Sequence, residues 1–114
     1  MDKSTKPCIV VVTLTPHPEH YAKVRDLVLE VIPDIHKDPG CVLYAPHDTT
    51  NGQLVLIEAW ADRDAWLAHF ELPAIKRLKQ ELPPWLAAPA SRVEMYGLEV
   101  GDPALGHLIR HRPG

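Results

Sequence analysis

Residues 53–69 read QLVLIEAWADRDAWLAH and contain a strand followed directly by the start of a helix, the pair of elements that decides the fold. The β-branched and large apolar residues at its beginning predict a strand over 53–61. Because side chains alternate along a strand, Glu58 shares one face with large apolar residues. Asp62 is a plausible helix N-cap, and the apolar residues after it recur at helical spacing. The stretch therefore places a carboxylate in an apolar strand that leads into a helix carrying His69.

Two more strands are predicted on the N-terminal side of this stretch. Residues 8–14 (CIVVVTL) form a β-branched run whose two faces are both apolar, so this strand needs a layer on each side. Residues 41–46 (CVLYAP) predict the next strand. Asn51-Gly52 is a strong hairpin signal, which makes the strands over 41–46 and 53–61 antiparallel neighbours.

Helical spacing of apolar residues predicts two helical regions, one on each side of the hairpin. The first extends over 21–35, and Pro33 predicts a kink or an end near Ile32, because proline lacks a backbone N–H and clashes with the preceding turn. The second begins within the quoted stretch and resumes at Pro73. Alternating side chains over 91–100 predict a fourth strand.

The predicted order of elements is β-α-β-β-α-β, which is the ferredoxin-like arrangement of the α+β class. It predicts a four-stranded antiparallel sheet with both helices on one face. The other face is apolar and has no third layer to cover it, so we expect a second copy of the chain to pack there as an isologous homodimer. We expect a flexible N-terminus over 1–7, one domain over 8–100 and a C-terminal tail over 101–114.

Composition excludes several broad classes. The chain has 114 residues, of which 46% are hydrophobic and 24% charged, as in an ordinary globular domain. Its net charge of −3 comes from interleaved charges of both signs, which argues against nucleic-acid binding. No apolar run approaches the ~18 residues of a membrane span, and the first seven residues do not resemble a secretory signal. Two cysteines are too few for a disulfide framework, so a cytoplasmic location is expected.

Four short motifs occur in order between residues 39 and 97. They are Pro39-Gly40-Cys41 followed by Tyr44, then Glu58-x-Trp60-x-Asp62, then His69, and finally Val93 to Gly97. With these motifs, about half of the chain resembles in detail the antibiotic biosynthesis monooxygenase domain of the dimeric α/β-barrel superfamily. Nearly all of it resembles that domain in the order of its elements.

The resemblance implies a small homodimer with a pocket in each subunit, between the sheet and the helices. Characterised members of the family oxidise phenols or quinols with dioxygen and use no flavin, haem or metal, because the substrate itself supplies the electrons. The task of the protein is then to bind a small aromatic ring, remove a phenolic proton and shelter the anion while oxygen adds.

His69 and Glu58 are the candidate catalytic residues. An imidazole titrates near neutral pH and can take a phenolic proton, so His69 is the candidate acid/base. A carboxylate in an apolar strand needs a partner or a raised pKa, and Glu58 can orient His69. The structural alternative is that the two residues form a buried hydrogen-bonded pair that locks the helix to the sheet.

Five aromatic or imidazole side chains are candidates for binding the substrate. Trp60 and Trp66 can stack on a planar ring, although aromatic residues at strand or helix spacing are more often part of the core. Tyr21, Tyr44 and His47 are placed at the mouth of the pocket, where Tyr44 can donate to a substrate oxygen. The alternative for each of these three is a surface or core position.

No metal site is predicted. His17-x-x-His20 and His107-x-x-x-His111 have spacings found among metal ligands, but neither lies in a Cys/His-rich context, so we interpret them as solvated histidines. Cys8 lies in an apolar strand pattern, where a free cysteine behaves as a small hydrophobic residue.

Other functions stay open. Haem degradation occurs in a branch of the superfamily that has a tryptophan in place of His69, a histidine ligand in place of Lys79 and an asparagine on its first strand, and these three departures argue against it here. An isomerase or lyase acting on a small oxygenated metabolite would use the same pocket. A dimer that binds a ligand without turnover would also use it.

Overall fold

A computed structural model describes residues 5–109, and it confirms the ferredoxin-like α+β fold. The elements are β1 (Cys8–Leu14), η1 (Pro18–His20), α1 (Tyr21–His36), β2 (Cys41–Asp48), β3 (Leu54–Trp60), α2 (Arg63–His69), α3 (Pro73–Glu81), η2 (Pro83–Trp85), β4 (Ser91–Met95) and α4 (Pro103–Gly106). The strands form one antiparallel sheet in the order β2-β3-β1-β4. This is the strand order that the β-α-β-β-α-β arrangement predicts.

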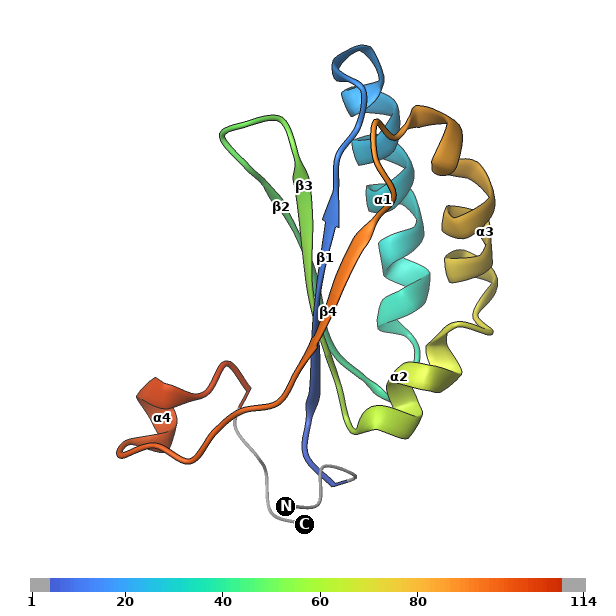
Figure 1. Cartoon of the computed structure of the whole chain (residues 1–114). Helices are drawn as coiled ribbons and strands as arrows, with labels where there is room; N and C mark the ends of the chain where they lie inside the picture. Colours follow the sequence, from blue (N-terminus) through green and yellow to red (C-terminus); the bar gives the residue numbers. More distant parts are fainter. Residues whose placement is uncertain (1–4, 110–114) are drawn as a thin grey trace.

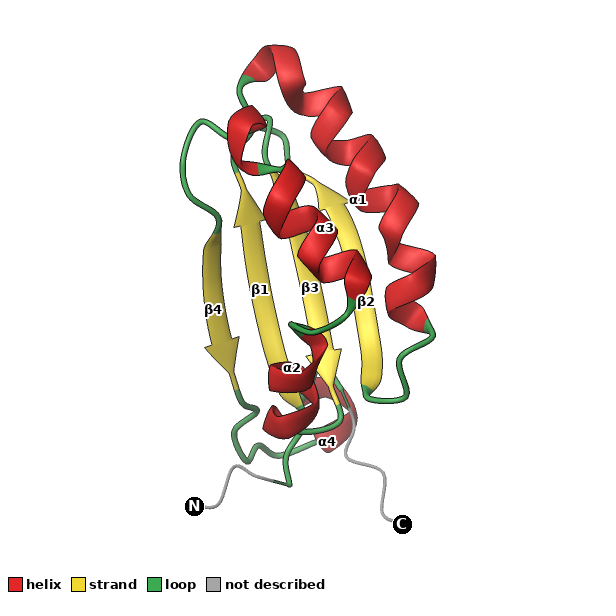
Figure 2. Cartoon of the chain, turned by 90° about the vertical axis from the view of Figure 1, so that its right-hand side faces the viewer, coloured by secondary structure: helices red, strands yellow, loops and turns green. Residues whose placement is uncertain are grey.

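Three helices form a layer on one face of the sheet. Figure 1 shows α1, α2 and α3 on the same side, and α4 on the opposite side near one end. In Figure 2, α1 and α3 run along the strands, and α2 lies at the end of the sheet where β3 leads into it. The main core lies between this layer and the sheet. The long helix α1 buries the side chains of Val24, Leu27, Val28, Val31, Ile32 and Ile35 there.

Pro33 does not end the first helix, so that part of the prediction was wrong. The helix continues through Pro33 to His36. Proline leaves the carbonyl four residues earlier, on Leu29, without an intrahelical partner. Leu29 is 48% exposed, so water can reach this carbonyl. Burial of Ile35 beyond the proline stabilises the last turn.

The strand predictions hold with shifted ends. β2 extends two residues beyond the predicted 41–46, whereas β4 ends at Met95 instead of residue 100. The hairpin turn lies where Asn51-Gly52 predicts it, and Gly52 has a φ of +84°, a conformation that favours glycine.

The described residues leave part of the domain prediction untested. Within residues 5–109, no helix is long and apolar enough to cross a membrane. The structure describes residues 101–109 of the predicted tail, which contain α4, whereas residues 110–114 lie outside the described part. The same holds for residues 1–4 of the predicted N-terminus.

Candidate functional site

A cavity of about 620 Å³ lies between the sheet and the α3 side of the helix layer. Apolar side chains of the strands, of α3 and of the segment 82–90 that follows α3 form most of its wall, among them Leu56, Leu78 and Leu86. Its polar side chains come from separate elements: Tyr44 from β2, Glu58 from β3 and His69 from α2. The structure therefore brings together the two predicted catalytic residues and one of the predicted binding residues. A cavity of this size, apolar with few polar groups, is typical of small-molecule sites.

Strand pairing places Tyr44 and Glu58 side by side. They are directly opposite each other in the β2–β3 pairing, so both side chains project from the helix-covered face. Glu58 is also opposite Val10 of the central strand β1. Both polar side chains are thus surrounded by the apolar core, with Glu58 2% and Tyr44 4% exposed.

His69 owes its position to the helix cap that the sequence predicts. The Asp62 side chain accepts a hydrogen bond of 2.8 Å from the backbone N–H of Ala65 and starts α2. His69 lies at the end of that helix and is 4% exposed. Its Nδ1 contacts the carbonyl oxygen of Trp66, which can only accept a hydrogen bond. Nδ1 therefore carries a proton, and Nε2 of the neutral ring has a free lone pair.

The free nitrogen faces Glu58. His69 Nε2 is 4.0 Å from Glu58 Oε1, which is too far for a direct hydrogen bond. The same carboxylate oxygen accepts a hydrogen bond of 3.1 Å from Trp60 Nε1. The two groups are therefore neighbours that a proton-bearing ligand atom can approach together.

Burial shifts the pKa of Glu58 and that of His69, in each case so that the neutral form is favoured. Desolvation raises the pKa of Glu58 to about 7, against the opposing effects of the Trp60 hydrogen bond and the Arg92 charge. Desolvation also lowers the pKa of His69, against the opposing hydrogen bond to Trp66. Near neutral pH the site therefore holds a neutral imidazole beside a carboxyl group that exchanges its proton readily. Such a pair can accept and return protons.

Tyr44 has a different chemical role. Burial, and then the nearby charge of Glu58, raise the pKa of Tyr44 far above its ordinary value. The phenol therefore keeps its proton and can act only as a hydrogen-bond donor or acceptor in the cavity.

Four predicted binding residues do not line the cavity. Trp60 is fully buried beside the site, with its ring 4.6 Å from that of His69 between centroids. Trp66 packs against Phe70, with 5.5 Å between ring centroids. Tyr21 lies at the start of α1, away from the cavity, and His47 is exposed on the opposite face of the sheet. The two tryptophans are thus part of the core next to the site, which is the alternative given for them in the sequence analysis.

Two basic residues that sequence reasoning missed also line the cavity. Arg92 pairs with Val12 in the β1–β4 ladder, which puts its side chain on the helix-covered face. Lys79 of α3 lies at the same cavity. The alternation in the fourth strand already groups Arg92 and Glu94 on one face, but only the strand register shows which face that is.

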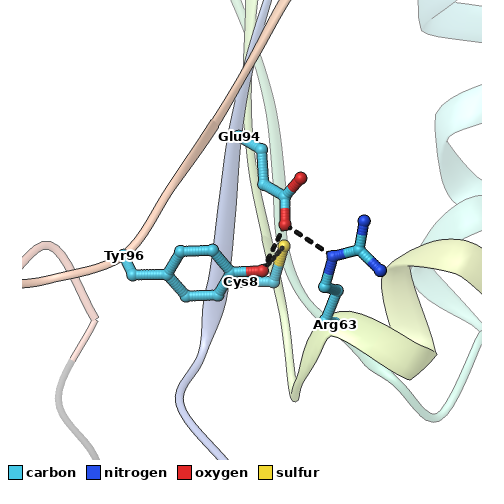
Figure 3. A network of polar contacts seen from close by, with 4 residues as sticks. All are labelled: Cys8, Arg63, Glu94 and Tyr96. Atoms are coloured by element: carbon cyan, nitrogen blue, oxygen red, sulfur yellow. Dashed lines mark hydrogen bonds and ion pairs between the residues drawn. The ribbon is translucent and has the colours of Figure 1, made fainter. Parts of the chain in front are cut away.

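Polar contacts fix the edge strand β4 against α2. Figure 3 shows that Tyr96 contacts Glu94 and Cys8, and that Arg63 at the start of α2 reaches the same carboxylate. The Arg63 Nε–Glu94 Oε2 distance is 2.8 Å, and Tyr96 donates to Cys8 Sγ over 3.6 Å. The contacts link the strand that carries Arg92 to the helix that carries His69.

Other sequence features do not join the cavity. A second hollow of about 650 Å³ lies between residues 5–9 and the tail, and it contains none of the predicted site residues. Within the described part of the chain, no group of three or more His, Cys, Asp or Glu side chains is arranged to hold a metal ion. The rings of His17 and His20 meet edge to face at 6.2 Å, and His111 lies outside the described residues.

Comparisons with known proteins identify relatives of this fold. The sequence profile described as antibiotic biosynthesis monooxygenase matches residues 7–81. No curated protein matches the sequence significantly.

Solved structures are similar over most of the chain. A Mycobacterium tuberculosis protein is 23% identical, with a TM-score of 0.78 over 84% of this chain and 99% of that one. A Pseudomonas aeruginosa protein is 20% identical, with a TM-score of 0.77 over 87% of this chain and 100% of that one. A Caulobacter crescentus protein, described as a candidate antibiotic biosynthesis monooxygenase, is 21% identical, with a TM-score of 0.78 over 85% and 94% of the two chains. At these identities the structures bear on the fold alone.

Proposed function

The chain belongs to the antibiotic biosynthesis monooxygenase family, and on that premise we propose that it is a cofactor-independent monooxygenase that oxidises a small aromatic phenol or quinol with dioxygen. The observation that carries the proposal is the free Nε2 of His69, which faces Glu58 inside an apolar cavity of about 620 Å³. A phenol bound there meets a neutral base, and its ring has room among apolar side chains.

The reaction starts with proton transfer. His69 Nε2 takes the phenolic proton, and Tyr44 donates a hydrogen bond to the phenolate oxygen. The phenolate gives one electron to dioxygen, and the resulting radical pair combines to form a C–O bond at a hydrogen-bearing ring carbon ortho or para to the hydroxyl group. His69 then returns its proton to the outer oxygen of the adduct.

The second half of the reaction forms the product. The carboxylate of Glu58 takes the proton from the ring carbon, the electron pair of that C–H bond forms the new carbonyl, and the O–O bond breaks. The departing hydroxide receives the proton from Glu58 and leaves as water. In total, one phenol and one dioxygen give one quinone and one water, and the substrate supplies all four electrons that reduce dioxygen.

Oxygen uptake tests the proposal. We would measure it for the metal-stripped protein with a panel of hydroquinones and polycyclic phenols, comparing wild type with His69→Gln. The glutamine keeps a polar side chain in this buried position, but it cannot cycle a proton near neutral pH, so we expect a loss of about 10²–10⁴-fold in turnover. His17→Gln is the matched control, because that histidine is exposed and does not line the cavity.

The outcomes separate the alternatives. Unchanged uptake in a folded His69→Gln variant would contradict the role of His69. No uptake by the wild type with any compound would contradict the monooxygenase and favour an isomerase, a lyase or a ligand-binding protein. Unfolding of His69→Gln, as seen in circular dichroism, would favour the structural interpretation of the His69–Glu58 pair.

A homodimer is the assembly we propose. Val11 lies between Ile57 and Val93 in the strand pairing, so a row of apolar side chains crosses the face without the three core helices. Val93 is 51% exposed in the single chain. A second sheet packed on this face would cover the row. Sedimentation velocity should therefore show a dimer for the wild type and a monomer for Val93→Arg.

A further inference from the structure

The cavity has two ends that differ in exposure and charge. Glu58 and His69 are only 2% and 4% exposed, and burial moves the pKa of each in the direction that favours its neutral form. Lys79 and Arg92 line the same cavity but are exposed. Figure 2 shows that β4 is an edge strand without a helix in front of it, whereas α3 lies over the neighbouring strands. The cavity is therefore open on the side of β4. The groups that can transfer protons therefore lie at the buried inner end of the cavity, and the two positively charged side chains lie at its exposed mouth.

Among residues 5–109, neither cation at the mouth forms an ion pair within 4.0 Å, although the charge of Arg92 acts on Glu58 at longer range. Two other cations of α3 do have acidic partners: Lys76 pairs with Glu71, just before the helix, at 3.1 Å, and Arg77 pairs with Glu81 at 2.7 Å. The guanidinium of Arg92 lies over the Phe70 ring, 5.1 Å from its centroid. This cation–π contact holds the side chain at the cavity and leaves the guanidinium without a carboxylate.

We propose that the cavity selects aromatic phenols that also carry a carboxylate, with the hydroxyl group at His69 and the carboxylate at Arg92 and Lys79. The inference rests on the proposed function, since it names the substrate class of the same site. Arginine binds carboxylates through two parallel hydrogen bonds, and lysine adds a point charge. The volume of about 620 Å³ is roughly four times that of a cavity that holds benzene, which gives room for two or three fused rings.

A binding experiment tests this selection without any turnover. The probes are 6-hydroxy-2-naphthoate and its neutral methyl ester, which share the ring and the hydroxyl group. Isothermal titration under nitrogen would give both dissociation constants for wild type, Arg92→Gln, Lys79→Gln and the double variant. The control is Lys76→Gln, which removes the same charge from α3 at a position that does not line the cavity.

For the wild type we expect the carboxylate to bind about tenfold more tightly than the ester, the equivalent of one charge-assisted hydrogen-bonded pair. The double variant should lose this preference, Arg92→Gln should lose most of it, and the Lys76→Gln control should keep it. Arg92→Lys should retain part of it. The preference should also decrease as salt is raised, because the mouth is exposed.

Equal affinity of the wild type for the two probes would overturn the inference, and so would a preference that survives in the double variant. The proposed function fails separately. A carboxylate preference without oxygen uptake would support the anion selection and contradict the monooxygenase. Oxygen uptake with neutral phenols, together with equal affinities, would do the reverse.

Discussion

The two halves of the helix layer cover the same sheet but pack differently. The α1 half is filled, because α1 contributes six buried apolar side chains over four turns. The α3 half is hollow, since the shorter α3 buries only Ile75 and Leu78 and leaves a cavity of about 620 Å³ next to β1 and β4. The polar residues Glu58 and His69 lie in the hollow half. One half therefore supplies most of the stability, and the other supplies the site.

This difference shows how a small chain can hold a binding site. Leaving a hollow sacrifices dispersion contacts and some buried apolar area. The filled half offsets that loss, and the central strand β1 connects both halves. The positions of the ionisable groups follow the same division, because an acid and a base in the filled half would have no ligand to act on.

Truncating one isoleucine in each half should give the largest contrast. Ile35 is fully buried in the α1 half, whereas Ile75 is 8% exposed and lines the cavity. Ile35→Ala should lower the free energy of unfolding by about 2–5 kcal/mol, since it creates a new void. Ile75→Ala should lower it by roughly half as much, because that side chain already borders a hollow. Urea denaturation of both variants measures the difference, and equal losses would contradict the division into two halves.

The next effect concerns the pH dependence of the buried carboxyl group. The pKa of Glu58 is about 7 in the folded protein, compared with an ordinary value of 4.5. Between these values the unfolded chain loses the proton first, so stability falls as pH rises from 4.5 to 7 and then stays level. Glu58→Gln removes this loss, and the variant should gain up to about 3 kcal/mol relative to wild type between pH 4 and pH 8.

Denaturation of both proteins at pH 4, 6 and 8 checks this expectation. His69 acts in the opposite sense, because its lowered pKa makes stability fall as pH drops below 6.5. Since both proteins retain His69, its contribution cancels in the comparison. A difference between wild type and variant that stays constant with pH would mean that the carboxyl group ionises as easily in the fold as in the unfolded chain.

Sequence alone predicted the fold, and it singled out Glu58 and His69, which line one cavity, but it did not single out Arg92 at the mouth of that cavity. The Asp62 cap and the Asn51-Gly52 turn are local signals that lie where they were predicted. The strand and helix periods also locate the elements, except that the fourth strand ends at Met95 and the first helix continues through Pro33. Glu58 stood out because a carboxylate in an apolar strand needs an explanation. Arg92 did not stand out, because basic residues are common on the solvent-facing side of a strand. Only the pairing with Val12 shows that Arg92 lies on the helix-covered face.

Two expectations differ from the structure for separate reasons. His47 lies on β2, three residues beyond Tyr44, and this odd spacing puts the two side chains on opposite faces of the sheet. Pro33 is a strong local signal, but burial of Ile35 beyond it outweighs the lost hydrogen bond. Tertiary packing decides whether a helix continues through a proline, and a single sequence does not show that packing.

A smaller effect is expected where α2 packs against the turn between α1 and β2. A Cβ atom on Gly40 would lie 2.7 Å from the Cβ of Ala65 in α2. Gly40→Ala should therefore push α2 away and cost about 1–3 kcal/mol of stability, as overpacking does. Oxygen uptake should fall as well, since α2 carries His69. Gly101→Ala is the control, because a Cβ there meets nothing within 4 Å.

The smallest expected effect tests how the hollow half is held at its edge. Arg63 is exposed and pairs with Glu94 at 2.8 Å, and surface pairs of this kind contribute little to stability because solvent screens them. Arg63→Ala should therefore lower the unfolding free energy less than Gly40→Ala does. If the contacts in Figure 3 align β4 with α2, the variant should weaken binding of 6-hydroxy-2-naphthoate more than binding of its methyl ester, because only the carboxylate depends on Arg92. Equal weakening of both ligands would mean that the pair contributes only general stability, and that the hollow half keeps its shape through the apolar packing of α3 alone.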